Sequence, residues 1–92
     1  ILHVRDIALA CAVDYPLPER ACPAPDAVER AIGLHVAGLV EDGATLQLGI
    51  GSVPDALLGA LGGHRDLGLH TEMFSDGVVD LVERGVLTGV HK

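Results

Sequence analysis

The sequence predicts an α/β fold with an open, mostly parallel β-sheet. Short apolar runs of strand length alternate with longer segments in which apolar residues recur at helical spacing. Glycine or proline separates almost every run from the next. The helical segments are long enough to carry the chain across the sheet from one parallel strand to the next. The predicted order is therefore strand, helix, strand, helix, strand, helix.

The size of the chain limits what it can do alone. Its 92 residues fit one small domain, and a domain of that size removes only about 60–65% of its surface from water on folding. The composition is 49% hydrophobic and 21% charged, which is typical of a globular protein and not of a disordered one. The sequence begins at Ile1 and not at methionine, and no helix cap or turn follows its last apolar run, so we expect a piece of a longer chain.

Charge and cysteine content exclude several classes of partner. The net charge is −7 and the six Lys and Arg residues are scattered, so no basic patch is available for nucleic acid or an anionic membrane. No apolar run approaches the ~20 residues that span a bilayer, and nothing at the start resembles a signal peptide. Cys11 and Cys22 are too few for a zinc cluster or a disulfide framework. We expect a reduced, cytoplasmic setting with no nucleic-acid or membrane partner.

The first predicted strand covers residues 7–13 (IALACAV), a nearly continuous apolar run. Pro16, Pro18, Pro23 and Pro25 then follow so closely that neither a helix nor a central strand fits between them. We expect an extended connector here, and with it a structural boundary.

The first predicted helix begins at Asp26, which can cap it, and ends at Gly43, which can adopt a left-handed conformation. A short strand over residues 44–48 (ATLQL) follows. The predicted inward face of the helix consists of apolar residues at helical spacing, namely Val28, Ile32, Val36, Leu39 and Val40.

The second predicted helix follows a Gly-Ile-Gly loop. Pro54 lies in its first turn, where the missing N–H costs nothing. Ser52 and Asp55 have the spacing of a weak capping box. The apolar residues that follow continue to the pair Gly62 and Gly63, where we expect the helix to end.

The last strand and helix complete the predicted order. The strand covers residues 66–70 (DLGLH) and the helix covers residues 76–84, with Asp76 as its cap and Gly85 as its end. The residues predicted to face inward on this helix are Val78, Val79, Leu81 and Val82.

A glycine-rich loop follows the carboxyl end of the strand 44–48, at the sheet edge where parallel sheets bind ligands. Gly49 and Gly51 permit close backbone approach, so N–H groups here and at the next helix start can bind a phosphate or thioester oxygen. A tight turn without a ligand explains the loop equally well. The loop lacks the third glycine of a dinucleotide motif and the Gly-Lys-Ser of a nucleotide P-loop, so nicotinamide and ATP are not favoured.

Glu72 follows the carboxyl end of the strand 66–70, and if the two strands are neighbours the loop and this carboxylate face one crevice. Glu72 also lies between apolar residues, so we expect its carboxylate to be half-buried. An ionised carboxylate can act as a nucleophile without an activating base; the alternative is a surface glutamate that caps the next helix. Gln47 precedes the loop and is either a candidate oxyanion donor or a partner in a cross-strand hydrogen bond. His70 and Glu72 share a strand face, but a zinc-deaminase site needs downstream cysteines, so we expect no metal.

The stretches LQLGIGSVPDALL and DLGLHTEMFSDGVVDLVERGVLTG resemble the acetyl-CoA hydrolase/transferase family, which includes 4-hydroxybutyrate, butyrate and acetate CoA-transferases. The similarity runs from about residue 24 to residue 89. The resemblance implies an open α/β sheet of the CoA-transferase type. It also implies that residues 1–23 are the end of an N-terminal domain with its connector, and that residues 24–92 begin a C-terminal domain.

The resemblance further implies an enzyme that moves CoA between an acyl-CoA and a carboxylic acid through a glutamyl-CoA thioester. Acyl-CoA would be a substrate, no cofactor would be tightly bound, and the full-length protein would be a homo-oligomer. In relatives the glutamate of the His-Thr-Glu-Met motif is the nucleophile, which corresponds to Glu72. The family's CoA-binding loop corresponds to Gly49, Ile50, Gly51, Ser52 and Val53.

Two alternatives remain open. One is an acyl-CoA hydrolase on the same scaffold, in which water replaces the acceptor acid. The other is a catalytically silent CoA-binding or assembly module in which Glu72 only caps a helix. Asp55 and Gly89 stand where many relatives have asparagine, outside the chemistry. Because relatives bind CoA with further glycine-rich segments, we expect these 92 residues to lack a complete site and activity of their own.

Overall fold

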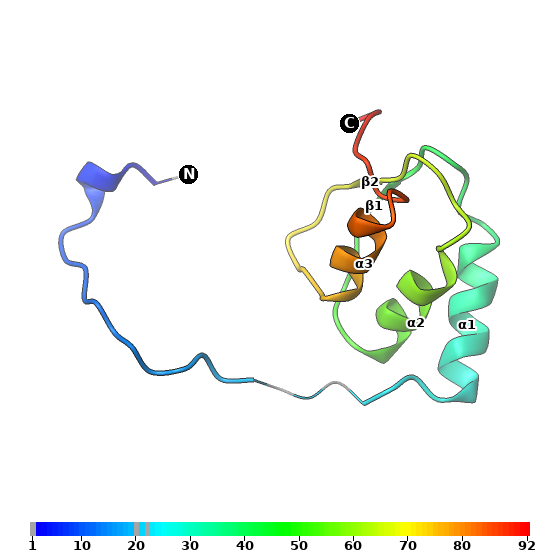
Figure 1. The fold of residues 1–92 in the computed structure, drawn as a ribbon, viewed down its shortest axis with the longest axis horizontal. Helices are drawn as coiled ribbons and strands as arrows, with labels where there is room; N and C mark the ends of the chain where they lie inside the picture. Colours follow the sequence, from blue (N-terminus) through cyan, green and yellow to red (C-terminus); the bar gives the residue numbers. More distant parts are fainter. Residues whose placement is uncertain (1, 20, 22) are drawn as a thin grey trace.

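The computed structural model describes residues 2–19, 21 and 23–92. Ile1, Arg20 and Cys22 lie outside the described residues, so of the two cysteines only Cys11 can be described, and it is exposed. An arm at the N-terminal end of the chain extends away from a body that holds the sheet and three helices (Figure 1). In chain order the elements are η1 (Val4–Asp6), α1 (Ala27–Ala37), β1 (Thr45–Leu46), α2 (Ser52–Ala60), β2 (Gly68–Leu69) and α3 (Gly77–Glu83).

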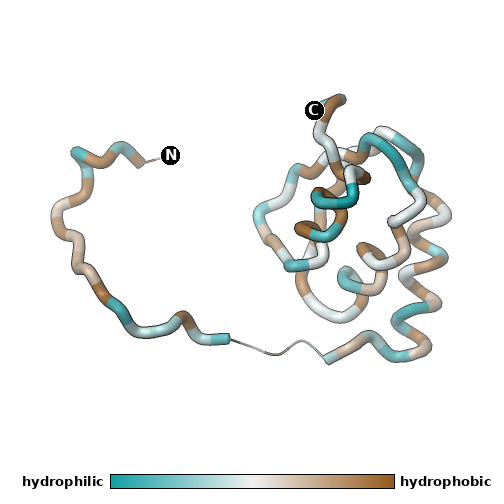
Figure 2. Tube along the Cα trace, viewed as in Figure 1, coloured by the Kyte–Doolittle hydropathy of each residue, from teal (hydrophilic) through white to brown (hydrophobic). Residues whose placement is uncertain are grey.

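The described residues 2–19 of the arm form no strand, so the predicted strand over residues 7–13 is wrong. Residues 2–19 are all exposed, and their only regular element is the single turn η1. The arm includes strongly hydrophobic stretches (Figure 2). Their side chains are not covered, and Leu9, for example, is 80% exposed. A strand needs a partner for its N–H and C=O groups, and none of the described residues pairs with this run. The proline-rich connector is free of helix and strand in its described residues, as predicted.

Helix α1 begins where the sequence predicts. The Asp26 carboxylate accepts hydrogen bonds from the N–H groups of Val28 and Glu29, both at 2.8 Å. The Glu29 carboxylate in turn accepts from the Asp26 N–H at 2.8 Å, which completes a capping box. The helix ends at Ala37, earlier than predicted, and Gly43 adopts its positive φ of 78° in a later turn.

The inward face of α1 differs from the predicted one. Val28 is 67% exposed and Leu39 is 82% exposed, with Ile32 and Val36 also on the exposed side. The helix instead buries Gly33 and Ala37. A Cβ on Gly33 would lie 2.7 Å from the backbone carbon of Ala56, so the two helix backbones are in direct contact. Small residues therefore decide which face of α1 packs on α2, and only Val40 of the predicted set packs against the core.

The sheet is parallel, as predicted, and very short. Thr45 pairs with Gly68 and Leu46 with Leu69, so β1 and β2 are neighbours although the helix α2 separates them in sequence. Each strand is two residues long, against the five predicted from the apolar runs. An isolated parallel bridge between Leu67 and Leu87 continues the sheet on the other side of β2, which the sequence did not predict.

Helix α2 begins with a different cap from the predicted one, whereas α3 begins at the predicted residue. The N-cap of α2 is Gly51, which makes no side-chain cap bond, so the predicted capping box of Ser52 and Asp55 is wrong. Pro54 does lie in the first turn. Asp76 occupies the N-cap position of α3, but its side chain makes no cap bond. Gly85 follows α3 with a φ of 70°, as predicted for a helix end.

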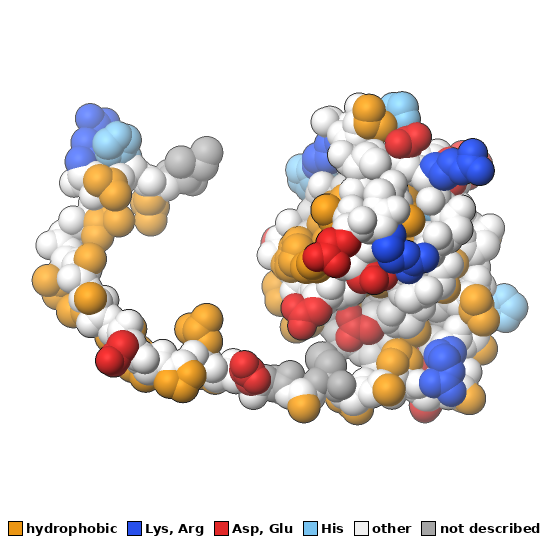
Figure 3. Space-filling view, viewed as in Figure 1, with side chains coloured by type: hydrophobic (Ala, Val, Ile, Leu, Met, Phe, Trp, Pro, Cys, Tyr) orange, Lys and Arg blue, Asp and Glu red, His pale blue; other side chains and the backbone are white. Residues whose placement is uncertain are grey.

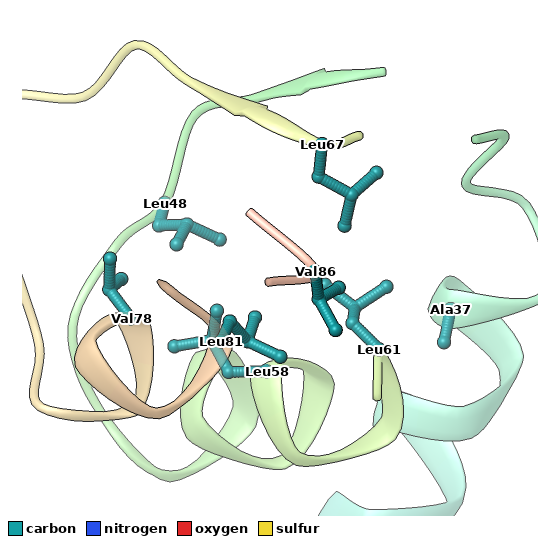
Figure 4. Packing of buried hydrophobic residues seen from close by; sticks show 8 residues of the cluster. All are labelled: Ala37, Leu48, Leu58, Leu61, Leu67, Val78, Leu81 and Val86. Carbon is teal, nitrogen blue, oxygen red and sulfur yellow. The ribbon is translucent and has the colours of Figure 1, made fainter. Parts of the chain in front are cut away.

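The core lies between α2, α3 and the sheet. Leu61, Leu67 and Leu81 are fully buried. On α3 only two of the four predicted residues face inward, because Val79 and Val82 are exposed. Across residues 2–19, 21 and 23–92, no helix has the length and apolar character needed to cross a bilayer. Figure 4 shows the side chains of the core cluster converging: Ala37, Leu48, Leu58, Leu61, Leu67, Val78, Leu81 and Val86.

Candidate active site

The two polar features predicted at strand ends lie at the same edge of the sheet. Residues 49–51 follow β1 and residues 70–72 follow β2, and the parallel pairing places both carboxyl ends together. The His70 N–H donates to the Leu46 carbonyl at 2.8 Å, which is the last backbone bond of this pair of strands toward that edge. The sequence-based expectation of a shared edge is confirmed.

A threonine hydroxyl joins the two features directly. Thr71 Oγ1 accepts a hydrogen bond from the Leu48 N–H at 3.2 Å and donates one to the Leu48 carbonyl at 2.9 Å. Leu48 immediately precedes the glycine loop and Thr71 immediately precedes Glu72. The two hydrogen bonds therefore hold the loop next to the candidate nucleophile. Sequence reasoning missed this residue, although its place beside Glu72 was a signal.

The glycine loop presents backbone donors. Gly51 has a φ of 121°, a conformation that favours glycine, and it leads directly into α2. Among the described residues, none accepts a hydrogen bond from the N–H groups of Ile50, Gly51, Ser52 or Val53. The Ser52 hydroxyl, in contrast, donates to the Glu29 carboxylate. The main chain of the loop, and not the serine hydroxyl, is thus free to bind an oxygen atom of a ligand.

A pocket of about 380 Å³ opens between the glycine loop and the turn that follows Glu72. Asp55 and Asp76 both contribute to its wall, so its electrostatic potential disfavours an anion. Acidic side chains are also spread over the face of the body seen in Figure 3. The buried Ser75 hydroxyl has no partner among the described residues. The full lining consists of Ile50, Gly51, Asp55, Phe74, Ser75, Asp76 and Gly77.

Glu72 is exposed, so the expectation of a half-buried carboxylate is wrong. The apolar neighbours Met73 and Phe74 do not cover it, because the chain bends after Thr71 and both are themselves exposed. Glu72 does not cap α3 either, since that helix begins five residues later at Gly77. Its carboxylate makes no hydrogen bond or ion pair with the described residues, and solvent and a ligand can reach it.

Gln47 and His70 lie beside the site. Gln47 is exposed and makes no hydrogen bond with the described residues, so the alternative of a cross-strand bond finds no support. His70 is exposed and its Nδ1 contacts Lys92 Nζ. The described part of the chain contains no group of three His, Cys, Asp or Glu side chains that could hold a metal ion.

Comparison with known proteins gives consistent results. No protein-family model matches the chain. It is 50% identical to the 4-hydroxybutyrate coenzyme A transferase of Clostridium kluyveri over 99% of its own length and 21% of that enzyme. It is 48% identical to the succinyl-CoA:acetate/propanoyl-CoA:succinate CoA transferase of Fasciola hepatica, over 99% of the chain and 19% of the relative.

A solved structure shows the same likeness in three dimensions. The chain superimposes on the 4-hydroxybutyrate CoA-transferase of Porphyromonas gingivalis with a TM-score of 0.73 and 51% sequence identity. This match covers 87% of the chain and 20% of that protein. The chain thus spans about a fifth of the length of the relatives that it matches.

Proposed function

The chain belongs to the family of the CoA-transferases over the fifth of their length that it spans, and from this premise we propose that it supplies the nucleophile and part of the acyl-CoA site of such an enzyme. The substrates would be an acyl-CoA and a small carboxylic acid of the acetate, butyrate or 4-hydroxybutyrate type. We also propose that residues 1–23 end one domain and that residues 24–92 begin the next. The complete protein would be a homo-oligomer.

Glu72 would carry the covalent chemistry. Its carboxylate attacks the thioester carbonyl of the acyl-CoA, which gives an acyl-glutamyl anhydride and releases CoA as a thiolate. The thiolate attacks the glutamyl carbonyl of the anhydride, which forms the glutamyl-CoA thioester and releases the first carboxylate. The acceptor carboxylate then attacks this thioester, and the same two steps run in reverse. The single observation that carries the proposal is the pair of Thr71–Leu48 hydrogen bonds, which holds an exposed carboxylate beside the loop.

The glycine loop would hold the uncharged part of the acyl-CoA. The N–H groups of residues 50–53 are free to donate to a carbonyl oxygen of the substrate, as an oxyanion site requires. Asp55 and Asp76 in the adjoining pocket oppose binding of the phosphates there. We therefore propose that the phosphates bind outside this pocket. Gln47 at the end of β1 would be a further oxyanion donor.

The two alternatives are less well supported. An acyl-CoA hydrolase is not favoured, because the named relatives are transferases. A silent module in which Glu72 caps a helix loses its structural basis, because Glu72 lies outside α3 and its cap.

Trapping of the covalent intermediate tests the proposal. The protein that carries this segment, at its natural length, is incubated with an acyl-CoA and borohydride and then analysed by mass spectrometry. Borohydride reduces a glutamyl thioester to a primary alcohol and releases CoA, so we expect the peptide that contains Glu72 to carry an alcohol in place of this carboxylate. We expect Glu72→Gln to lose both this modification and CoA transfer to acetate. Glu83→Gln, which changes an exposed glutamate on α3, is the matched control and should keep both. An active Glu72→Gln enzyme would refute the proposal, and release of the acyl group to water alone would favour the hydrolase.

A further inference from the structure

The β1–β2 ladder stops earlier than its register requires. Leu46 pairs with Leu69, and the His70 N–H donates to the Leu46 carbonyl. In a parallel ladder the next pair lies two residues further along each strand. Leu48 would then pair with Thr71, donating to the His70 carbonyl and accepting from the Glu72 N–H. Neither of these two backbone hydrogen bonds is present between the described residues.

The Thr71 hydroxyl takes the place of this missing pair. Its oxygen accepts from the Leu48 N–H and its proton goes to the Leu48 carbonyl, so both backbone groups that the ladder would use are occupied. A threonine hydroxyl has one proton to donate and two lone pairs to accept with, and this arrangement uses the proton and one of the lone pairs. The β-branched side chain has few χ1 rotamers, which keeps the hydroxyl in place.

The substitution of a side chain for a backbone pair changes the course of the main chain. The Glu72 N–H and the His70 carbonyl are released from the sheet, and no described residue pairs with either. The chain bends directly after Thr71, and Glu72 becomes exposed. A ladder that continued would instead fix the Glu72 backbone against Leu48.

We propose that Thr71 is a positioning residue whose hydroxyl ends the parallel ladder and thereby sets the orientation of Glu72 toward the substrate. The effect on catalysis rests on the proposed function of Glu72; the effect on the backbone does not. Without the hydroxyl, Leu48 regains its two backbone partners, and the Glu72 backbone moves toward the sheet. A displacement of about 1 Å at a reacting group is enough for a rate loss of about 10²-fold.

Three variants of the protein at its natural length test the proposal. Thr71→Val keeps the shape of the side chain and removes the hydroxyl, and we expect kcat to fall by about 10²-fold while KM for the acyl-CoA stays near its original value. Thr71→Ser keeps the hydroxyl and should restore most of kcat. Thr88→Val is the matched control. Thr88 Oγ1 donates to the Asp66 carboxylate at a distance of 3.3 Å, and this bond lies away from the edge that holds Glu72. Removal of the Thr88 hydroxyl should therefore leave kcat unchanged. Equal losses in Thr71→Val and Thr71→Ser, or none in Thr71→Val, would overturn the proposal.

Amide hydrogen exchange gives a readout that is independent of activity. Its first measurement uses the unmodified protein and its second uses Thr71→Val. In the unmodified protein we expect slow exchange of the Leu48 and His70 amides and fast exchange of the Glu72 amide. In Thr71→Val the Glu72 amide should become protected as the ladder extends. A protected Glu72 amide in the unmodified protein would contradict the inference even if Thr71→Val failed to fold. If Glu72→Gln were fully active, the proposed function of Glu72 would be refuted. The exchange pattern would still decide whether the Thr71 hydroxyl ends the parallel ladder.

Discussion

Replacement of Gly33 by alanine should push α1 and α2 slightly apart and destabilise the fold. An added Cβ would lie 2.7 Å from the backbone carbon of Ala56, 2.8 Å from its oxygen and 2.8 Å from the Leu57 nitrogen. Ordinary contacts of this kind begin at 3.4 Å. All three neighbours are backbone atoms, which cannot rotate out of the way as a side chain can. The two helices must therefore move apart by roughly 0.7 Å, which is the difference between 3.4 and 2.7 Å.

Two opposing effects determine the free energy of unfolding of Gly33→Ala. Overpacking of a well-packed contact costs about 1–3 kcal/mol. Alanine in the interior of a helix gains about 1 kcal/mol over glycine. Because the clash involves backbone alone, we place its cost in the upper part of that range, and the expected net loss of stability is about 1–2 kcal/mol. The close contact, and not the helix propensity, should thus determine that the free energy of unfolding falls.

The assay is urea unfolding of the 92-residue chain, followed by circular dichroism. Gly59→Ala is the matched control, since Gly59 also lies inside a helix and a Cβ there would meet nothing within 4 Å. This control should gain up to about 1 kcal/mol from helix propensity alone. If Gly33→Ala were as stable as the original chain or more stable, the close contact of α1 with α2 would be refuted.

Two further outcomes are expected. In a double-mutant cycle of Glu29→Gln and Ser52→Ala, measured by urea unfolding, the coupling should be about 1 kcal/mol, because the Glu29 carboxylate accepts from the Ser52 hydroxyl; purely additive losses would argue against that contact. The 92-residue chain alone should show no CoA transfer in a coupled spectrophotometric assay, because its open pocket of about 380 Å³ is small for an acyl-CoA. Transfer by the isolated chain would show that the site is already complete.

Local chemistry and strand order could be predicted from the sequence. Asp26 caps α1 as its side chain and position indicate, and Gly85 ends α3 with a positive φ. The alternation of apolar runs with helical segments predicted parallel strands, and the structure shows that β1 and β2 are neighbours. Because ligand sites follow the carboxyl ends of such strands, the sequence places the glycine loop and Glu72 at two of these ends, and at one edge on the condition that the strands are neighbours.

The packed face of α1 could not be predicted in the same way. Helical spacing shows that Val28, Ile32 and Val36 share a face, but it does not show what lies opposite. The structure packs Gly33 and Ala37 against α2 and leaves the larger apolar residues exposed. Close backbone approach depends on the shape of the partner, which a periodic pattern does not contain.

The exposure of Glu72 and the role of Thr71 were also beyond the sequence pattern. The apolar neighbours of Glu72 suggested a half-buried side chain, as if the strand continued through it. The strand in fact ends at Leu69, and the hydroxyl of Thr71 makes hydrogen bonds with the N–H and the carbonyl of Leu48. Hydrogen bonds from a side chain to a distant main chain have no periodic signature, so the pattern of the sequence does not show that Thr71 pairs with Leu48.

The shortness of the parallel sheet has a consequence for the order of folding. Pairing of Thr45 with Gly68 closes a loop of about 23 residues, which costs about 3 kcal/mol of chain entropy. Two residue pairs with hydrogen bonds of about 1 kcal/mol each cannot offset this cost alone. We therefore expect the strands to join only after α2 has packed on α1 and shortened the loop. The glycine loop and Glu72 would then be brought together only late in folding.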